Sequence, residues 1–179
     1  WTAAQKIVVY SEPEGLPALR HELANYLHFS RGVRCLADQI ILTGGHQHSL
    51  AVLAGLFSCE NWKFAMEEPG YNGTRIVMRQ YGFSPVLIPV ESDGISVAEA
   101  KRLSHALLYI TPSHQFPMGS VLPIAKRLEL LQWAAKSGSY ILEDDYDSEL
   151  RYHSLPIPSL QSIDNNERTI YMGTFSKSL

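Results

Sequence analysis

The sequence lacks several features that mark specialised classes of protein. Its two cysteines, Cys35 and Cys59, are far apart and do not form the close pairs of a zinc knuckle or a redox motif. No stretch reaches the roughly 18 apolar residues that a membrane-spanning helix needs. The start at Trp1 has neither the basic end nor the apolar core of a signal peptide. We therefore expect a cytoplasmic protein that does not enter a membrane.

Basic residues are not concentrated anywhere in the chain. The formal net charge is −3, and no run of Lys or Arg follows one face of a predicted helix. The chain therefore lacks the electrostatic footprint of a DNA-binding domain. Any contact with DNA would have to come from a domain outside this chain.

The composition is that of a folded domain. Of the 179 residues, 45% are hydrophobic and 18% are charged, and these proportions support one globular unit with a continuous core. We expect residues 1–179 to form a single domain. Because the chain begins with Trp1 and stops at Leu179 directly after a strong motif, we also expect it to be a fragment.

The apolar residues follow helical and strand spacings in turn. From Gly15 to Phe29 they recur at intervals of three, four and seven, which predicts an amphipathic helix that packs one face inward. Short apolar runs predict six strands, at residues 39–43, 63–67, 85–89, 107–111, 140–143 and 169–173. Helical patterns lie between most of them, at residues 47–58, 73–81, 97–104 and 123–136. A polar, proline-containing stretch, 154–166, predicts one longer surface loop.

This alternation predicts an α/β fold, a three-layer sandwich whose mostly parallel sheet is covered by helices on both faces. Ligands of such sheets bind beyond the carboxyl ends of the strands. Five polar or glycine-containing segments follow predicted strands, at residues 43–47, 68–71, 111–119, 144–147 and 174–177. We therefore expect a ligand site at that edge of the sheet.

Two of these segments are compatible with phosphate binding and amine chemistry. Gly44 and Gly45 precede a predicted helix, so backbone N–H groups there can point at a phosphate, although a plain tight turn explains two glycines equally well. Lys177 follows a buried strand among small hydroxyl residues, where a desolvated lysine would be suited to imine formation. Most lysines, however, are solvated surface charges.

The acidic segment allows several interpretations. Asp144 ends an apolar run and would be a partly buried carboxylate, which needs a cationic partner such as a protonated pyridine nitrogen. The cluster also has two plainer interpretations, a solvated turn and a divalent-metal site, although it lacks the glycine and the ligand spacing of a calcium loop. His46 and His48 point in different directions on a helix, so we expect no metal on this pair and a structural role for His48.

Together these segments resemble the fold-type-I pyridoxal-phosphate superfamily, and specifically the aminotransferase-like domain of MocR-type (GntR-family) transcriptional regulators. Six stretches carry the resemblance, at residues 15–20, 30–33, 68–71, 111–119, 143–149 and 173–178. The fourth and fifth favour the regulators over ordinary class I aminotransferases, in which an Asn-Pro-x-Gly element is usual. The resemblance implies the large domain of the aminotransferase class I fold, without an N-terminal DNA-binding domain and a C-terminal small domain.

The resemblance implies pyridoxal 5′-phosphate as the cofactor, with four residues around its ring. Lys177 matches the lysine that holds the cofactor as a Schiff base. Asp144 matches the carboxylate that pairs with the pyridine nitrogen and keeps it protonated, so that the ring can act as an electron sink. Tyr71 matches the aromatic ring that stacks on the pyridine, and Tyr146 matches the phenol that hydrogen-bonds the ring hydroxyl. Lys177, Asp144 and Tyr146 are thus the candidate catalytic residues.

The resemblance also implies how the phosphate is bound. Gly45, His46 and Gln47 match the phosphate-cradling turn, with His46 in place of a small hydroxyl residue. Thr174 matches a hydroxyl residue that binds the phosphate, and Ser176 belongs to the same motif.

Two further positions bear on this assignment. Tyr10 resembles a tyrosine that, in relatives, reaches the phosphate of the neighbouring subunit, which implies a homodimer with shared sites. Phe116 stands where many aminotransferases place an asparagine that contacts the ring hydroxyl. That contact is therefore absent, or His114 or Gln115 supplies it.

Three functions compete. The resemblance implies a sensory domain of a transcriptional regulator, in which a small amino compound reacts with the lysine-bound aldehyde and changes the conformation seen by a DNA-binding domain elsewhere. The alternative is a free-standing aminotransferase that moves an amino group between an amino acid and a 2-oxo acid, with Lys177 also transferring the proton. A metal-dependent α/β hydrolase built on the cluster from Asp144 to Asp147 ranks far below both.

Overall fold

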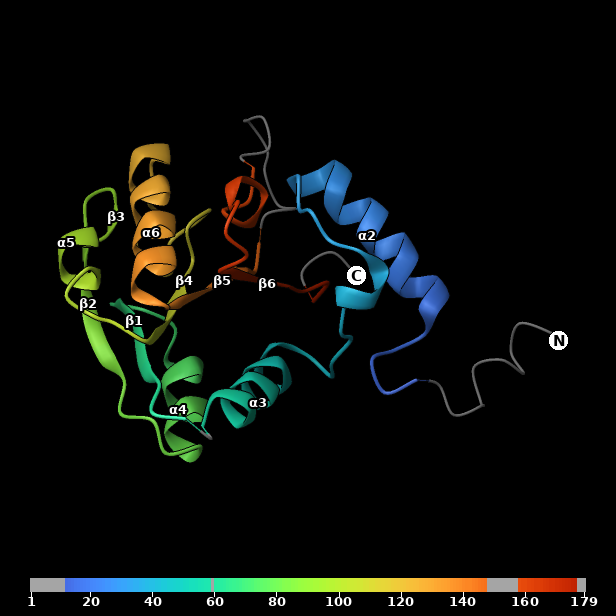
Figure 1. Cartoon of the computed structure of the whole chain (residues 1–179), viewed down its shortest axis with the longest axis horizontal. Helices are drawn as coiled ribbons and strands as arrows, with labels where there is room; N and C mark the ends of the chain where they lie inside the picture. Colours follow the sequence, from blue (N-terminus) through green and yellow to red (C-terminus); the bar gives the residue numbers. More distant parts are fainter. Residues whose placement is uncertain (1–11, 59, 148–157, 177–179) are drawn as a thin grey trace, which may run out of the picture.

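The structure, a computed structural model, describes residues 12–58, 60–147 and 158–176. Its centre is a six-stranded sheet in the order β3-β2-β1-β4-β5-β6 (Figure 1). The strands are β1 Lys63–Glu68, β2 Val86–Glu91, β3 Gly94–Ile95, β4 Ala106–Ile110, β5 Tyr140–Asp145 and β6 Thr169–Gly173. Every neighbouring pair is parallel except β2 and β3, which are antiparallel.

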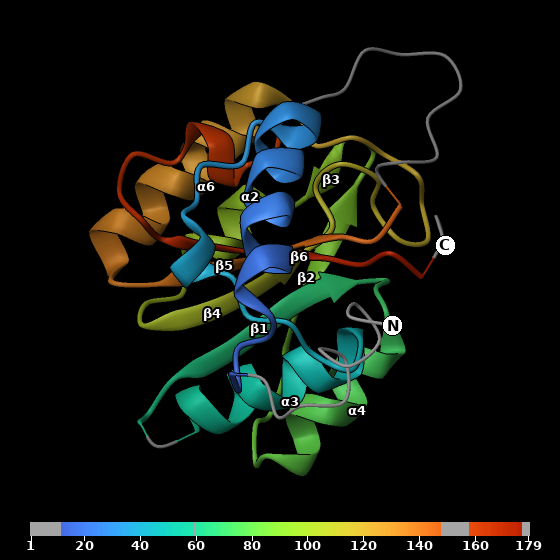
Figure 2. The same ribbon diagram turned by 90° about the vertical axis from the view of Figure 1, so that its right-hand side faces the viewer.

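Helices cover both faces of this sheet, as the alternation of patterns predicts (Figure 2). The helices are α2 Pro17–Arg31, α3 His46–Phe57, α4 Asn72–Gln80, α5 Val97–Ala100 and α6 Ile124–Ser137, with short 3₁₀ helices η1 Ala37–Gln39 and η2 Gln161–Ile163. Helices α3 and α4 cover one face, and α5 and α6 cover the other. None of the helices in the described ranges is long and apolar enough to cross a membrane.

The central strand β4 is buried along its whole length. Successive side chains of a strand point to opposite faces, so β4 supplies both halves of the core. Leu108 and Ile110 pack with α5 and α6, whereas Leu107 and Tyr109 pack with α3 and α4. A strand that is apolar on both faces is typical of a parallel sheet covered by helices.

The predicted strand at residues 39–43 is wrong. Residues 37–39 form η1, and Leu42 donates its backbone N–H to Glu14 O at 2.8 Å rather than to a strand of the sheet. Strand β1 already has β2 on one side and β4 on the other. The apolar run instead packs against the preceding loop, where Gly15 lies against the Leu42 side chain.

Three smaller differences concern β3, α2 and the last loop. The two-residue β3 follows the turn at Asp93 and was not predicted, although an Asp-Gly pair is a hairpin signal. Helix α2 forms as expected but does not bury its apolar stripe, since its buried residues are Arg20 and Arg31. The described part of the predicted surface loop, 158–166, contains η2 and buries Leu160 completely.

Candidate functional site

Asp144 lies at the carboxyl end of β5, and its side chain faces the layer formed by α3 and α4. It is 5% exposed. Its Oδ2 accepts a hydrogen bond from the Tyr109 hydroxyl and lies 3.0 Å from His46 Nε2. Among the described residues both contacts of this carboxylate are to Oδ2, which leaves Oδ1 available to a ligand. The structure thus places His46 against the carboxylate for which a pyridine nitrogen was predicted as partner.

The turn before α3 forms an open cradle for an anion. Gly45 precedes the helix with φ of 114° and ψ of 174°, a conformation that favours glycine, and no atom lies within 4 Å of where its Cβ would be. No side chain caps the helix, so the first backbone N–H groups, including those of His46 and Gln47, have no partner within the helix. These groups and the helix dipole favour a phosphate. His48 accepts a hydrogen bond from Gly44 N at 3.0 Å, the structural role expected for it.

Four rings follow one another edge to face, beginning at His46, which contacts Asp144, and form what we call the aromatic wall: His46, Tyr71, Phe116 and Tyr146. The ring centroids lie 5.6 Å apart for His46 and Tyr71, 6.0 Å for Tyr71 and Phe116, and 6.2 Å for Phe116 and Tyr146. Tyr71 is 37% exposed and Phe116 is 40% exposed, so part of the wall is open to a flat ligand. Phe116, which replaces the usual asparagine, contributes an apolar ring here.

Gln115 and His114 are the two residues that could replace the contact of the usual asparagine. In the structure, the polar atoms of Gln115 already have other partners. Gln115 is buried; its amide donates to Pro69 O at 3.0 Å and Phe116 O at 2.7 Å, and its oxygen accepts from Met118 N. Its polar atoms thus hold the loop. His114 is exposed, lies 3.2 Å from the Tyr146 hydroxyl through Nδ1, and contacts the Asp147 carboxylate. Burial and the nearby Asp147 charge raise the pKa of Tyr146, which keeps the phenol protonated.

The hydroxyl pair after β6 lies in the described chain, whereas two predicted residues do not. Thr174 Oγ1 is 2.9 Å from Ser176 Oγ and accepts a hydrogen bond from Ser176 N at 3.2 Å. Lys177 and Tyr10 lie outside the described residues. Their predicted roles stay predictions.

The acidic segment does not gather into a metal site in the part of the chain that the structure describes. Its carboxylates face different partners. Glu143 is fully buried and accepts hydrogen bonds from Leu160 N and Gln161 N. Asp145 pairs with Arg31, and Asp144 faces the aromatic wall. This divergence argues against the hydrolase interpretation.

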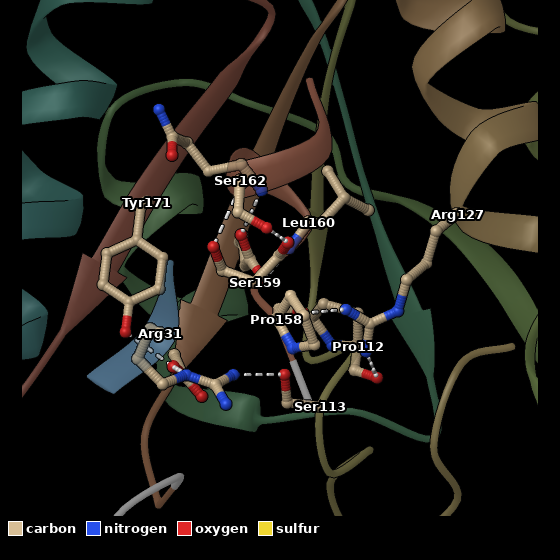
Figure 3. A network of polar contacts seen from close by, with 12 residues as sticks. Arg31, Pro112, Ser113, Arg127, Pro158, Ser159, Leu160, Ser162 and Tyr171 are labelled. Carbon is tan, nitrogen blue, oxygen red and sulfur yellow. Dashed lines mark hydrogen bonds and ion pairs between the residues drawn. The ribbon is translucent and has the colours of Figure 1, made fainter. Parts of the chain in front are cut away.

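A buried polar network on the other side of β5 was not predicted (Figure 3). Arg31 donates to Asp145 Oδ2 at 2.6 Å and to Ser113 Oγ at 2.7 Å, and the Tyr171 hydroxyl donates to the same Asp145 oxygen at 2.6 Å. Arg127 donates to three backbone carbonyls of neighbouring loops. The sequence offered no clear local signal for this network, because Arg127 stands next to Lys126 and Asp145 lies within an acidic run.

Glu67, near the end of β1, is a second group that was not predicted. It is 3% exposed, and its Oε2 accepts hydrogen bonds from Thr111 N at 3.0 Å and Thr111 Oγ1 at 2.8 Å. Burial raises its pKa to about 7, and the charge of Asp144 acts in the same direction. A glutamate in a buried apolar strand is the signal that would have identified it.

Comparison with known proteins gives consistent results. The model of the family "aminotransferase class I and II" matches residues 2–179. The chain is 45% identical to the HTH-type transcriptional regulator YdeL of Bacillus subtilis, covering 90% of this chain and 35% of that protein. It is 42% identical to the probable rhizopine catabolism regulatory protein MocR of Rhizobium meliloti, covering 92% and 34%. The chain thus spans about a third of the length of these relatives.

Solved structures share the fold. An archaeal alanine:glyoxylate aminotransferase superposes with a TM-score of 0.86 at 31% identity, covering 97% of this chain and 45% of that one. LysN, the α-aminoadipate aminotransferase of Thermus thermophilus in complex with N-(5′-phosphopyridoxyl)-L-leucine, gives a TM-score of 0.83 at 30% identity, covering 96% and 44%. With a family match over nearly its whole length and this sheet order, the chain belongs to the aminotransferase class I and II family.

Proposed function

We propose that this chain is the aminotransferase-like effector domain of a transcriptional regulator and that it senses a small amino compound through bound pyridoxal 5′-phosphate. The observation that carries the proposal is the buried Asp144 carboxylate at the carboxyl end of β5, whose two contacts in the described chain, to Tyr109 and His46, are both to Oδ2. The sequence identities favour a sensor. The chain is 45% and 42% identical to the two regulators but 31% identical to the 2-aminoadipate transaminase of Thermus thermophilus.

The residues present fit the chemistry of this cofactor. Asp144 would hold the pyridine nitrogen, because a buried carboxylate pairs with a protonated heterocycle. The open turn at Gly45 and the first N–H groups of α3, at His46 and Gln47, would hold the phosphate. When bound, the cofactor supplies an electron sink for reactions of amino compounds.

The remaining assignments concern the ring face, its hydroxyl and the covalent link. Tyr71 would cover one face of the ring, and the Tyr146 phenol would donate to the ring oxygen, because its raised pKa keeps it a donor. Thr174 and Ser176 would add hydroxyl contacts to the phosphate. Lys177 would hold the cofactor covalently.

The partners are part of the same proposal. Tyr10 would reach the phosphate of a second copy in a homodimer. DNA would be bound by a domain outside this chain, and the protein would act in the cytoplasm. The effector in this proposal is a small compound with an amino group, because that group reacts with the cofactor.

The test is an absorbance spectrum of the full-length protein with pyridoxal 5′-phosphate, before and after borohydride reduction. We expect a band near the visible edge that reduction abolishes, with peptide mapping placing the modification on Lys177. Lys177→Ala should lack the band, whereas Lys136→Ala, at the end of α6, should keep it. Persistence of the band in Lys177→Ala would contradict the assignment.

A second test addresses Asp144. Asp144→Ala should leave some cofactor bound but lower its reactivity with amines, because the pyridine nitrogen loses its anionic partner. Unchanged reactivity would mean that another group holds this nitrogen.

The second candidate is a free-standing aminotransferase, favoured by the fold shared with LysN. Transamination assays on the full-length protein with a panel of amino acids separate the two. Repeated formation of 2-oxo acid would favour the enzyme. An amine-dependent spectral change without turnover, together with altered DNA binding, would favour the sensor.

A further inference from the structure

Tyr109 is a buried tyrosine that has no role in the proposed function described above. It lies within β4, is 1% exposed and packs among apolar side chains. Its hydroxyl donates to Asp144 Oδ2. Burial, followed by the negative charge of Asp144, raises the pKa of Tyr109 well above its ordinary value, so the phenol remains a neutral donor. Because an unbonded hydroxyl in such a place is costly, this hydrogen bond is a fixed part of the structure.

The strand register brings the two side chains together. Tyr109 pairs with Leu142 across β4 and β5, and Asp144 lies two residues further along β5 on the same face. The long Tyr109 side chain spans this diagonal and brings its hydroxyl to Asp144 Oδ2. The contact therefore follows from the sheet and needs no loop to form it.

Asp144 Oδ2 is contacted from two directions. Tyr109 reaches it from the sheet, and His46 Nε2 reaches it from the start of α3 at 3.0 Å. His46 Nε2 also lies 3.4 Å from the Tyr109 oxygen. Two contacts on one oxygen fix the rotation of the carboxylate and thus the direction of Oδ1.

We propose that Tyr109 is a positioning residue, which holds Oδ2 of Asp144 so that Oδ1 is directed at the pyridine nitrogen of the cofactor. The inference rests on the proposed function. Loss of the hydroxyl leaves the negative charge in place but leaves only the His46 contact on Oδ2, so the carboxylate can rotate more freely. A ligand with a pyridine nitrogen should then lose more affinity than the same ligand with carbon at that position.

The test compares the affinities of pyridoxal 5′-phosphate and its 1-deaza analogue, measured by fluorescence quenching on the full-length protein. Wild type should prefer pyridoxal 5′-phosphate. Tyr109→Phe, which keeps the ring and removes only the hydroxyl, should reduce this preference by about tenfold, the scale of one hydrogen bond to a charged group. The ratio of the two affinities is the decisive readout, because a purely structural loss would weaken both ligands equally.

Tyr171→Phe is the matched control. Tyr171, on β6, donates to Oδ2 of Asp145, the residue that follows Asp144 on β5, at 2.6 Å. Burial likewise raises the pKa of Tyr171. Its removal should lower the melting temperature much as Tyr109→Phe does but leave the ligand preference unchanged. In an Asp144→Asn background, Tyr109→Phe should have no further effect on the preference.

The outcomes separate the inference from the proposed function. Failure of wild type to bind either ligand would overturn both. A wild type that prefers pyridoxal 5′-phosphate, together with Tyr109→Phe that keeps the full preference, would overturn this inference alone. Should Tyr109→Phe not fold, Asp144→Glu moves the carboxylate off the Tyr109 hydroxyl with its charge retained. It should lose the preference, and a full preference there would overturn the inference.

Discussion

Arg31, the last residue of α2, is joined to Asp145 on β5 by an ion pair of 2.6 Å between Nε and Oδ2, with side chains only 4% and 1% exposed. This pair ties the end of α2 to the sheet directly beside Asp144. Helix α2 does not bury its apolar stripe, so the ion pair and the hydrogen bonds around it are what fix the end of this helix. The proposed site thus has a rigid support on the far side of β5.

Arg31→Ala should lower the free energy of unfolding by about 3–5 kcal/mol, because it leaves the Asp145 carboxylate buried without its positive partner. Urea denaturation followed by circular dichroism measures this loss. The control is Arg102→Ala, whose partner Glu99 lies 2.8 Å away on the surface and whose side chain is 74% exposed. That change should cost less than about 1 kcal/mol. Equal losses in the two variants would show that the buried pair does not stabilise the fold.

Glu67→Gln should change the pH dependence of stability. The pKa of Glu67 is about 7 in the folded chain and close to 4.3 in the unfolded chain. Between these values the folded state binds more protons, so this group lowers stability as pH rises. The variant cannot titrate. Its stability relative to wild type should therefore increase from pH 5 to pH 8, by on the order of 1–3 kcal/mol. A difference that stays constant over this range would contradict the raised pKa.

Gly45→Ala should destabilise the chain through backbone strain alone, because open space surrounds the added Cβ while φ is 114°. We expect a loss of about 1–3 kcal/mol. Gly138→Ala is the matched control, since that site is equally open but has a φ of 66°, nearer to the left-handed helical region that other residues tolerate. Its cost should be smaller. The same Gly45→Ala chain should bind pyridoxal 5′-phosphate more weakly, which fluorescence titration measures.

Arg127→Lys should be strongly destabilising despite the retained charge. The guanidinium of Arg127 donates to Leu122 O at 2.9 Å, Pro158 O at 2.9 Å and Pro112 O at 2.8 Å. One ammonium group cannot reproduce this fork of donors, so we expect a loss of about 2–4 kcal/mol in a thermal or urea melt. Arg79→Lys, at the exposed end of α4, should stay within about 0.5 kcal/mol of wild type. A lysine that restores full stability at position 127 would contradict the role of the fork.

Much of the fold could be read from local spacing. The strands β1, β2, β4, β5 and β6 lie within two residues of their predicted positions, because a buried parallel strand is a short apolar run whatever lies beside it. Residues 39–43 have the same local pattern and are not a strand. Their backbone bonds to the preceding loop, through Leu42 N to Glu14 O, instead of to a strand, and the presence of a pairing strand is not a property of the run itself.

The residues of the candidate site likewise fall into those that the sequence identified and those that it did not. Asp144 and the turn at Gly45 were identifiable from sequence, since each ends or begins an element whose position follows from its own residues and its neighbours along the chain. Tyr109 and Arg31 were not identifiable, and the sequence marks Glu67 only as a glutamate in an apolar run, without its partner. Their partners lie in other elements, and they meet only through the register of β4 on β5 and the docking of α2. Periodicity is local and can be read from the order of residues, whereas register and burial arise from contacts between distant segments.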